Sequence, residues 1–577
     1  TRGWETVELK RFQTIDANAL VTISAHRFER LREQGAFYID KTEFIREWWE
    51  KGSDVTLITR PRRFGKTLNM SMLECFFSTQ YAGRGDLFEG LSIWEGRYRE
   101  LQGTFPVLFL TFANMKAARY ADMEYKITKV FSDLYEQHRY LLDGTLLSRN
   151  EREYYEHVKP GMAMQGVADV IHSLAGFMRR YYKKDVVILL DEYDTPMQEA
   201  WINGYWDQAV EFFGEFFNST FKTNPYLERA MITGITRISK ESIFSDLNNL
   251  DVITTTSDEY AAAFGFTEEE VFRTLDAVGL GAEKQGVKQW YDGFTFGSVT
   301  DIYNPWSIAS FIRKKGRYEA YWTNTSSNSL VNALVQNGDA DIKQTMEALL
   351  QEKSFVTELD EQVVFNQLGK DNNAVWSLLL AAGYLKVLKT EAAEDTVFYT
   401  LTLTNFEVRQ MFRKMVKGWF QGSTTVVYNE FIKAMLNDNV CMMNAFMNKV
   451  ALNTFSSFDS GSKPSEEAEP ERFYHGFVLG MVVNLADTYK VCSNRESGYG
   501  RYDVMLKPLD QSGKAFIFEF KVLNPYENEK TLEETLANAH RQIEEKCYET
   551  ELLSEGFVSG QIRKYGFAFQ GKKCLIG

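Results

Sequence analysis

The residues best suited to chemistry in the first half of the chain form a short loop. The loop follows an apolar segment at 55–59, which we expect to be a strand, and it runs into a segment that we expect to be a helix from Lys66 onward. At the N-terminus of a helix, backbone N–H groups, the helix dipole and an ammonium group together favour a phosphate. We therefore expect a nucleotide to be bound by Arg62, Arg63, Phe64, Gly65, Lys66 and Thr67.

Two positions of this loop need separate comment. The hydroxyl of Thr67 is a candidate ligand of Mg²⁺, because Ser or Thr at this place in such loops ligates the ion. The first position of the pattern G-x-x-x-x-G-K-[ST] is Arg60 instead of glycine, which removes backbone freedom there. We expect this departure to affect the rate of hydrolysis more than binding. Arg62 and Arg63 are either phosphate contacts or residues that only line the loop.

A second apolar run, 186–190, ends in two acidic residues and has the form of a Walker B strand. Asp191 is expected to hold Mg²⁺ through its water shell, and Glu192 to orient or deprotonate the attacking water. The alternative is an ordinary buried strand with a polar end. Because the loop and this strand occur together and in the usual order, we favour nucleotide binding.

The end of a further apolar segment, 230–234, supplies candidates for sensing the γ-phosphate. Thr233 and Thr236 have hydroxyls suited to that contact, and Arg237 has a charge suited to the transition state of phosphoryl transfer. A structural salt bridge is an equally reasonable role for Arg237.

The C-terminal part of the chain has a different constellation. Asp503 ends one expected strand, while Glu519 and Lys521 lie two residues apart on the next one and so project from the same face. A hairpin brings Asp503 beside them. Two carboxylates form a hard oxygen site for Mg²⁺ or Mn²⁺, and a lysine positions water or offsets phosphate charge. Exposed strands also carry alternating charges, but this strand is otherwise apolar, so its charged residues need partners.

Several motifs recur in the order found in one known family. They occupy residues 38–42, 60–67, 190–194, 233–240, 242–250, 290–294 and 303–305. With these motifs, the chain resembles, over nearly its whole length, the bacterial family of AAA-ATPase-like proteins fused to a C-terminal PD-(D/E)XK nuclease-superfamily domain. The resemblance implies that residues 38–42 lie near the nucleotide.

The same resemblance implies roles for residues of the C-terminal constellation. Asp503 and Glu519 match the metal carboxylates of the nuclease superfamily, and Lys521 matches its catalytic lysine. Glu471 matches an acidic residue on the first helix that joins the metal shell. Gln542, with Tyr548 after it, is similar to the Gln and Tyr on the helix that follows the core strands in RecB-like members. The residue before Asp503 is Tyr502 where the family often has proline.

The length of 577 residues predicts three or four domains, in a multidomain α/β fold. We predict an AAA/ASCE-like P-loop domain with a parallel sheet at 26–250 and a helical lid-like region at 251–330. A helical region at 331–455 contains a winged-helix-like piece, formed by a helix at 373–382 and a two-stranded ribbon. A restriction-endonuclease-like α/β domain follows at 471–577, after a linker rich in Ser, Gly, Glu and Pro.

Charge and composition restrict the class of protein. A formal net charge of −14 is not that of a typical nucleic-acid binder, so any basic track must be local. Five scattered cysteines without a C-x-x-C pair argue against a disulfide framework or a zinc site. The longest apolar stretch is too short to cross a membrane, and the N-terminus lacks the apolar core of a signal peptide. We expect a cytoplasmic protein.

These observations predict an ATP-binding and ATP-hydrolysing protein whose nuclease domain cleaves phosphodiester bonds under nucleotide control. The expected cofactors are ATP and Mg²⁺, with Mn²⁺ as an alternative at the nuclease site, and the expected substrate is DNA rather than RNA. The alternative is a nucleotide-dependent signalling or interaction module whose C-terminal domain binds nucleic acid without cutting it. A translocating helicase–nuclease is disfavoured, since the sequence has one nucleotide site. Monomeric and ring-shaped assemblies both stay open.

Overall fold

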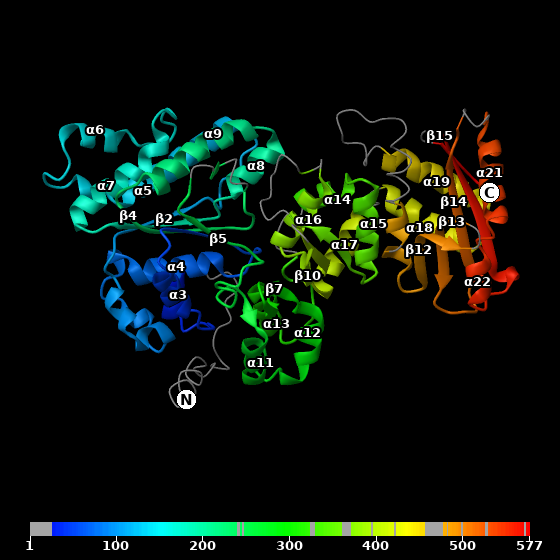
Figure 1. Ribbon diagram of the computed structural model, residues 1–577, viewed down its shortest axis with the longest axis horizontal. Coiled ribbons are helices and arrows are strands. Elements are labelled where there is room, and N and C mark those ends of the chain that lie inside the picture. Colours follow the sequence, from blue (N-terminus) through cyan, green and yellow to red (C-terminus); the bar gives the residue numbers. More distant parts are fainter. Residues whose placement is uncertain are drawn as a thin grey trace. The chain divides into compact units, whose positions relative to one another are not determined.

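The computed structural model groups the chain into two compact units (Figure 1). The first unit comprises Thr1–Ser326 and Val356–Val408, and the second comprises Ser327–Phe355 and Arg409–Gly577. The residues described are 26–238, 243–244, 247–323, 329–359, 368, 371–393, 396–419, 423–455, 477–481, 483–497, 500–524, 529–570 and 573–577. None of the helices among them combines the length and apolar character needed to span a bilayer.

The first unit is built on a parallel sheet of five strands in the order β2-β3-β4-β1-β5. The strands are β1 (Val55–Thr59), β2 (Val107–Thr111), β3 (Val186–Asp191), β4 (Leu227–Gly234) and β5 (Leu250–Ile253). Strands β1, β3 and β4 match the predicted apolar segments, although β4 begins three residues before the segment at 230–234, and β5 was not predicted. The early part of β4 contains Glu228 and Arg229, and Arg229 stacks 4.2 Å from the ring of Trp49.

Helices cover both faces of this sheet, which explains why β1 and β3 are buried at every position (Figure 1). On one face lie α3 (Glu43–Lys51) and α4 (Lys66–Phe77); on the other lie α5 (Tyr120–Gln137), α7 (Val170–Tyr182), α8 (Thr195–Asn203) and α9 (Trp206–Phe217). Because β4 lies between β1 and β3, the carboxyl ends of these three strands are neighbours. Ligands in open parallel sheets bind at such an edge.

The rest of the first unit packs against the loop that follows β1. It contains a small sheet, β6-β8-β7, with strands β6 (Phe266–Thr267), β7 (Phe294–Phe296) and β8 (Val299–Tyr303). Helices α11 (Glu268–Ala277), α12 (Lys284–Tyr291) and α13 (Pro305–Arg313) surround an apolar cluster that includes Val271, Tyr291 and Phe311. The predicted capping box of Thr267 and Glu270 is present at the start of α11.

A helix and a three-stranded sheet complete this unit. Helix α16 (Asn372–Ala381) precedes the antiparallel strands β10 (Leu385–Ala393) and β11 (Thr396–Leu403), and β9 (Phe355–Glu358) is the third strand, in the order β10-β11-β9. The helix and the ribbon match the predicted segments. Their assignment as a winged helix stays a prediction, as do the four domain boundaries.

The second unit contains a mixed sheet in the order β12-β13-β14-β15-β16. Its strands are β12 (Tyr489–Ser497), β13 (Gly500–Pro508), β14 (Ala515–Val522), β15 (Ile562–Gln570) and β16 (Lys573–Ile576). All neighbours are antiparallel except β14 and β15, which are parallel and are connected through α21 (Leu532–Glu545) and α22 (Thr550–Ser554). A mixed sheet with this crossover fits the predicted nuclease domain.

Helices from the middle of the chain cover both edges of this sheet. Asn444 and Asn448, one turn apart on α19 (Val440–Phe455), exchange hydrogen bonds of 2.7–2.9 Å with the backbone of β16. At the other edge, Gln351, after α15 (Ala340–Leu350), donates to the carbonyl of Val491 in β12. Side chains thus satisfy backbone groups that an open edge would expose. The unit also contains α14 (Ser329–Gln336) and α18 (Ser423–Leu436), and α17 (Phe406–Trp419) begins in the first unit.

Candidate active sites

Asp191, at the carboxyl end of β3, is the centre of the first candidate site. It is 1% exposed and accepts two hydrogen bonds, from the hydroxyl of Thr67 at 2.7 Å and from the hydroxyl of Thr233 at 2.6 Å. The strand order explains these two contacts. Strand β4, which carries Thr233, lies between β3, which ends in Asp191, and β1, which leads into the loop before Thr67. Two hard oxygens, a hydroxyl and a carboxylate, are therefore already in contact, and this donor set fits Mg²⁺.

Lys66 is folded into the loop at the start of α4. Its ammonium group donates 2.8 Å hydrogen bonds to the carbonyls of Arg60 and Pro61, and burial lowers its pKa. A buried ammonium is stable only with partners of this kind. The charge thus lies at the centre of the loop, among the backbone groups that precede the helix.

The backbone of the loop explains the missing glycine. Positive φ values, which favour glycine, occur at Arg63 (67°) and Gly65 (83°), whereas Arg60 is not among the residues with positive φ. The Arg60 side chain is fully buried: it donates to the carbonyls of Thr254 and Glu259, and its guanidinium stacks 4.6 Å from the ring of Phe296. Arginine at this position fills space and fastens the loop to the chain beyond β5, with burial lowering its pKa to about 9.

The residues between Arg60 and Gly65 are held by the small sheet and α13. The carbonyl of Arg62 accepts hydrogen bonds from Asn304 Nδ2 at 3.3 Å and Trp322 Nε1 at 3.0 Å. The Arg63 guanidinium stacks 4.3 Å from the ring of Trp306, and the ring of Phe64 lies 4.7 Å from that of Phe294. Arg63 and Phe64 thus have structural partners, and their predicted contacts with a phosphate stay predictions, as does that of Arg62.

Glu192 follows Asp191 in a strained conformation, with a φ of 55°. Burial raises the pKa of its carboxyl, and the charges of Asp191 and Asp194 act in the same direction. A carboxyl with a raised pKa suits a general base near neutral pH. Strain at a buried acidic residue beside a candidate metal ligand is typical of functional sites.

The turn after β4 is fastened to the residues after β3. Asp194, 1% exposed, accepts hydrogen bonds from the backbone of Ile235 and from the backbone and hydroxyl of Thr236, at 2.8–3.0 Å. The ring of Tyr193 lies against Gly234, where an added Cβ would come within 2.6 Å of it. The hydroxyl of Thr236 is thereby engaged away from Asp191, in contrast to that of Thr233. Arg237 follows on this turn, half-buried, and its role stays a prediction.

Residues 38–42 make contacts that organise α3 and α4. The hydroxyl of Tyr38 donates to the sulfur of Met72 in α4, and Asp40 accepts hydrogen bonds from Thr42 and Ser92. The ammonium group of Lys41 pairs with Glu270 at 2.7 Å. These contacts account for the segment structurally, and its predicted proximity to a nucleotide stays a prediction.

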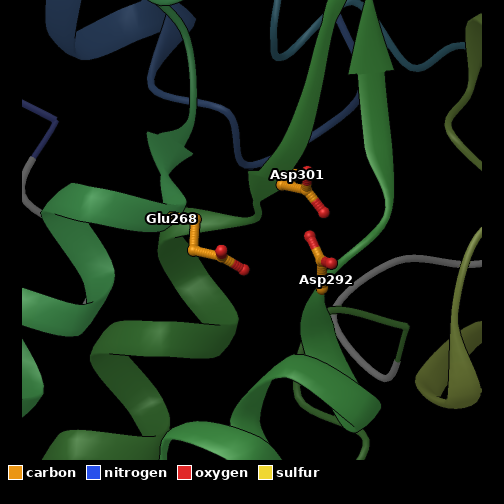
Figure 2. Close-up of side chains that lie close together, drawn as sticks. All are labelled: Glu268, Asp292 and Asp301. Carbon is orange, nitrogen blue, oxygen red and sulfur yellow. The ribbon is translucent and has the colours of Figure 1, made fainter.

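A cluster of acidic side chains behind the loop was not predicted. Glu268, Asp292 and Asp301 bring carboxylate oxygens within 4.8 Å of one another (Figure 2). Lys288 forms ion pairs with all three, and the hydroxyl of Tyr303 donates to Glu268. The pKa of Asp292 is raised to about 7 by burial and by Asp301. The motif at 290–294 was the only signal in the sequence, since these residues come from three separate elements.

The second candidate site lies in the hairpin of β13 and β14. Val504 pairs with Phe518, so Asp503 and Glu519 are the next residues on the two strands. The carboxylate of Asp503 accepts a 2.7 Å hydrogen bond from the backbone N–H of Phe520. Lys521 follows Glu519 by two residues and therefore shares its face. The structure thus brings together the three residues that the sequence singled out.

Gln542 reaches this site from α21. Its amide donates to Glu519 and also, at 3.0 Å, to the hydroxyl of Tyr548. The helix comes close enough because Gly566 of β15, which pairs with Glu519, has no side chain: an added Cβ would lie 2.7 Å from Leu536 of α21. The predicted grouping of Gln542 with the strand residues is therefore observed. Glu471 lies outside the described residues.

The electrostatics of Glu519 fit a metal ligand. The residue is 3% exposed, its Oε2 atom has no hydrogen-bond partner within the part of the chain that the structure describes, and burial together with the charge of Asp503 raises its pKa. The charge of Lys521 lowers that pKa, but less strongly. An unpaired buried carboxylate oxygen beside a second carboxylate is costly unless a cation neutralises it. Residues of this type at this place fit Mg²⁺ or Mn²⁺.

Comparisons with known proteins match the two segments of the chain that contain these sites. A family model described as "Predicted AAA-ATPase" matches residues 22–244, and one described as "PD-(D/E)XK nuclease superfamily" matches residues 469–577. The "Uncharacterized protein in vnfD 5'region" of Azotobacter chroococcum mcd 1 is 25% identical over 519 residues, which cover 87% of this chain and 89% of that protein. The resemblance stated from the motifs is confirmed at both ends of the chain.

Proposed function

We propose that this chain, which joins a predicted AAA-ATPase-like domain to a PD-(D/E)XK nuclease-superfamily domain, is an ATP-dependent nuclease that cleaves DNA. The first unit binds and hydrolyses ATP, and the second hydrolyses phosphodiester bonds under the control of that nucleotide. The observation that carries the nuclease proposal is the buried oxygen of Glu519 next to Asp503, which has no hydrogen-bond partner among the described residues. A metal-dependent nuclease uses carboxylates in such a position to hold its ion.

The roles in the first unit follow from the contacts of each residue. Lys66 and the N–H groups of the loop, from Arg62 to Thr67, bind the phosphates of ATP, with Arg62 and Arg63 as further cations. Thr67 and Asp191 hold Mg²⁺, which neutralises charge between the phosphates when bound. Glu192 accepts the proton of the attacking water, and its raised pKa supports this role. Thr233 keeps Asp191 in position, and Arg237 stabilises negative charge in the transition state.

The roles in the second unit follow in the same way. Asp503 and Glu519 hold the metal, joined by Glu471, and the bound ion lowers the pKa of a water molecule and polarises the phosphate. Lys521 positions that water or offsets charge on the scissile phosphate. Gln542 donates its amide to Glu519 and so fixes the orientation of the carboxylate. We propose DNA rather than RNA as the substrate because of the domain pairing. We also propose a cytoplasmic location.

A cleavage assay tests the proposal. Purified protein is incubated with supercoiled plasmid and either Mg²⁺ or Mn²⁺, with and without ATP, beside the variants Lys521→Ala and Lys530→Ala. Lys530 is an exposed lysine that precedes α21 and serves as the matched control. We expect metal-dependent cleavage that is lost in Lys521→Ala and kept in Lys530→Ala. Absence of cleavage in the wild type across plasmid, linear DNA, single strands and RNA would contradict the proposal and favour a binding module.

A further inference from the structure

One buried carboxylate in the first unit is used by neither site. Glu407, in the first turn of α17, is 1% exposed. Its Oε1 accepts hydrogen bonds from the backbone N–H groups of Trp322 and Thr323, and its Oε2 accepts one of 2.9 Å from the hydroxyl of Ser307. Burying a carboxylate costs several kcal/mol before such bonds are made, roughly as for other buried charges. The hydrogen bonds from Trp322, Thr323 and Ser307 offset this cost, so Glu407 depends on the position of these donors.

Two partners of Glu407, Trp322 and Ser307, connect it to the loop of residues 60–67, which we call the phosphate loop. Trp322, whose backbone N–H donates to Glu407, uses its ring Nε1–H to hold the carbonyl of Arg62 at 3.0 Å. Ser307 lies in the first turn of α13, whose N-cap, Asn304, donates to the same carbonyl at 3.3 Å. One carboxylate therefore fixes both groups that bind the Arg62 carbonyl.

The orientation of that carbonyl sets the orientation of a phosphate donor. A peptide group is planar and trans, so its C=O and the following N–H point in opposite directions. When the carbonyl of Arg62 points to Trp322 and Asn304, the N–H of Arg63 points away from them. Arg63 has a φ of 67°, a conformation that non-glycine residues keep only when their surroundings enforce it. The Trp322 and Asn304 bonds, together with the stacking of Arg63 on Trp306, supply that enforcement.

Glu407 also lies next to the point where the chain leaves the first unit. Val408 is the last residue of that unit and Arg409 the first residue of the second, and both belong to α17. A change at Glu407 therefore acts on the helix that connects the nucleotide unit to the nuclease unit. Movement of a helix terminus by a buried contact is a common element of conformational switches.

We infer that Glu407 is a positioning residue that, through Trp322, aligns the phosphate loop for ATP and transmits nucleotide occupancy to α17. The inference rests on the proposed function, since it names the regulation of the same nucleotide site. Binding of ATP tightens the loop, the Trp322 contact and the anchoring of α17 together. By linkage, weakening the contact weakens ATP binding, and ATP binding protects the contact.

Three variants test the linked contacts of Glu407, Trp322 and the Arg62 carbonyl, which we call the strap. Trp322→Phe keeps the ring and the backbone bond to Glu407 but loses the bond to Arg62. Glu407→Ala removes the anchor, and Glu407→Gln restores an acceptor for the two backbone N–H groups and a group able to bond Ser307. Glu391→Gln, a change at an exposed glutamate of β10 that pairs with Lys389, is the matched control. Thermal melting of each variant identifies any that fails to fold.

The measurements are the Kd for ATP with Mg²⁺, the ratio of cleavage rates with and without ATP, and hydrogen exchange of the α17 amides with and without ATP. We expect Trp322→Phe and Glu407→Ala to bind ATP about three- to tenfold more weakly, the range for one or two hydrogen bonds. We expect both to lose the ATP-induced protection of α17 and the ATP dependence of cleavage. Cleavage without ATP is unchanged, and Glu407→Gln regains most of the response.

The outcomes separate the strap from the function. If ATP protects α17 in the wild type but not in Trp322→Phe or Glu407→Ala, and no protein cleaves, the nuclease proposal fails and the strap holds. If the wild type cleaves in an ATP-dependent way and Trp322→Phe and Glu407→Ala respond to ATP as the control does, the strap is wrong and the function holds. If the wild type does not bind ATP, both are overturned.

Discussion

Replacing Glu519 by Gln changes the stability of the second unit in opposite directions with and without metal. In the metal-free protein, Oε2 of Glu519 is buried, lacks a hydrogen-bond partner among the residues described, and is affected by the charge of Asp503. The amide of Gln carries no charge, keeps an acceptor for Gln542 and turns a donor toward Asp503. An unsatisfied buried polar group costs about 1–3 kcal/mol. We therefore expect Glu519→Gln to be more stable than the wild type by roughly that amount when metal is removed.

Bound metal reverses this order of stability, so that the wild type becomes more stable than Glu519→Gln. An ion that binds only the folded wild type stabilises it by about 2.7 kcal/mol at a concentration one hundred times its Kd. The variant has lost one of the proposed carboxylate ligands, so the ion stabilises it little. The assay is thermal melting at pH 8 in EDTA and in Mn²⁺ or Mg²⁺, where each kcal/mol corresponds to roughly 2–4 °C in Tm for a unit of this size. Glu545→Gln, an exposed change on α21, is the control and melts like the wild type in both conditions.

The pH dependence has a definite sign. Because the folded-state pKa of Glu519 is raised, the folded protein holds its proton more tightly than the unfolded chain does, and this contribution to stability is lost as pH rises through the folded pKa. The advantage of Glu519→Gln in EDTA should thus grow from pH 5 to pH 8. An equal or lower Tm for the variant at pH 8 in EDTA, or a metal-induced rise as large as that of the wild type, would refute the reasoning.

Three further predictions concern other residues. Glu192→Gln should bind ATP like the wild type but hydrolyse it about 10²–10⁴-fold more slowly, as measured by phosphate release, because the general base is lost; equal rates would exclude that role. Gly566→Ala should lower the Tm of the second unit by the equivalent of about 1–3 kcal/mol and reduce cleavage, since its Cβ would lie 2.7 Å from Leu536 and push α21 away from Glu519; an unchanged melting curve would show that the helix adjusts freely. Asp292→Asn should reduce the rise in Tm of the first unit between pH 8 and pH 6, because the pKa of Asp292 is raised to about 7 and its protonated form favours folding as pH falls, while Glu407, whose pKa is also raised to about 7, keeps its share of the rise; a variant that keeps the full wild-type pH profile would contradict this.

The strands β1, β3 and β4 and the acidic residues of the two candidate sites could be predicted because their signals are local. The segment 55–59 is a continuous apolar run between polar residues, and it is observed as β1 with the same bounds. Asp503 and Glu519 could be grouped because a hairpin joins consecutive strands and side chains alternate with a period of two. Thr267 and Glu270 formed a capping box, which depends only on spacing along the chain.

The contacts of the loop could not be predicted because their partners are distant in sequence. Arg60 looked like a defect in the glycine pattern, and only the carbonyls of Thr254 and Glu259, almost 200 residues later, explain it. The same holds for Trp322, which lies 260 residues after the carbonyl that it binds. Propensity and periodicity contain no information about such pairs.

The membership of the middle helices also needed the structure. Asn444 and Asn448 are one turn apart on a helix, a spacing that is typical of many solvent-exposed faces. Their pairing with both backbone groups of the edge strand β16 assigns α19 to the second unit. A sequence pattern specifies which face of a helix is polar, but not which strand edge that face covers.

The most direct test of nucleotide control is the rate of plasmid cleavage as ATP is titrated, in the wild type and in Lys66→Ala, with Mg²⁺ held constant. We predict a cleavage rate that changes with ATP in the wild type and is independent of ATP in Lys66→Ala, whose nuclease residues are intact. Cleavage that does not respond to ATP in the wild type, or that responds equally in both proteins, would contradict control of the nuclease by the phosphate loop.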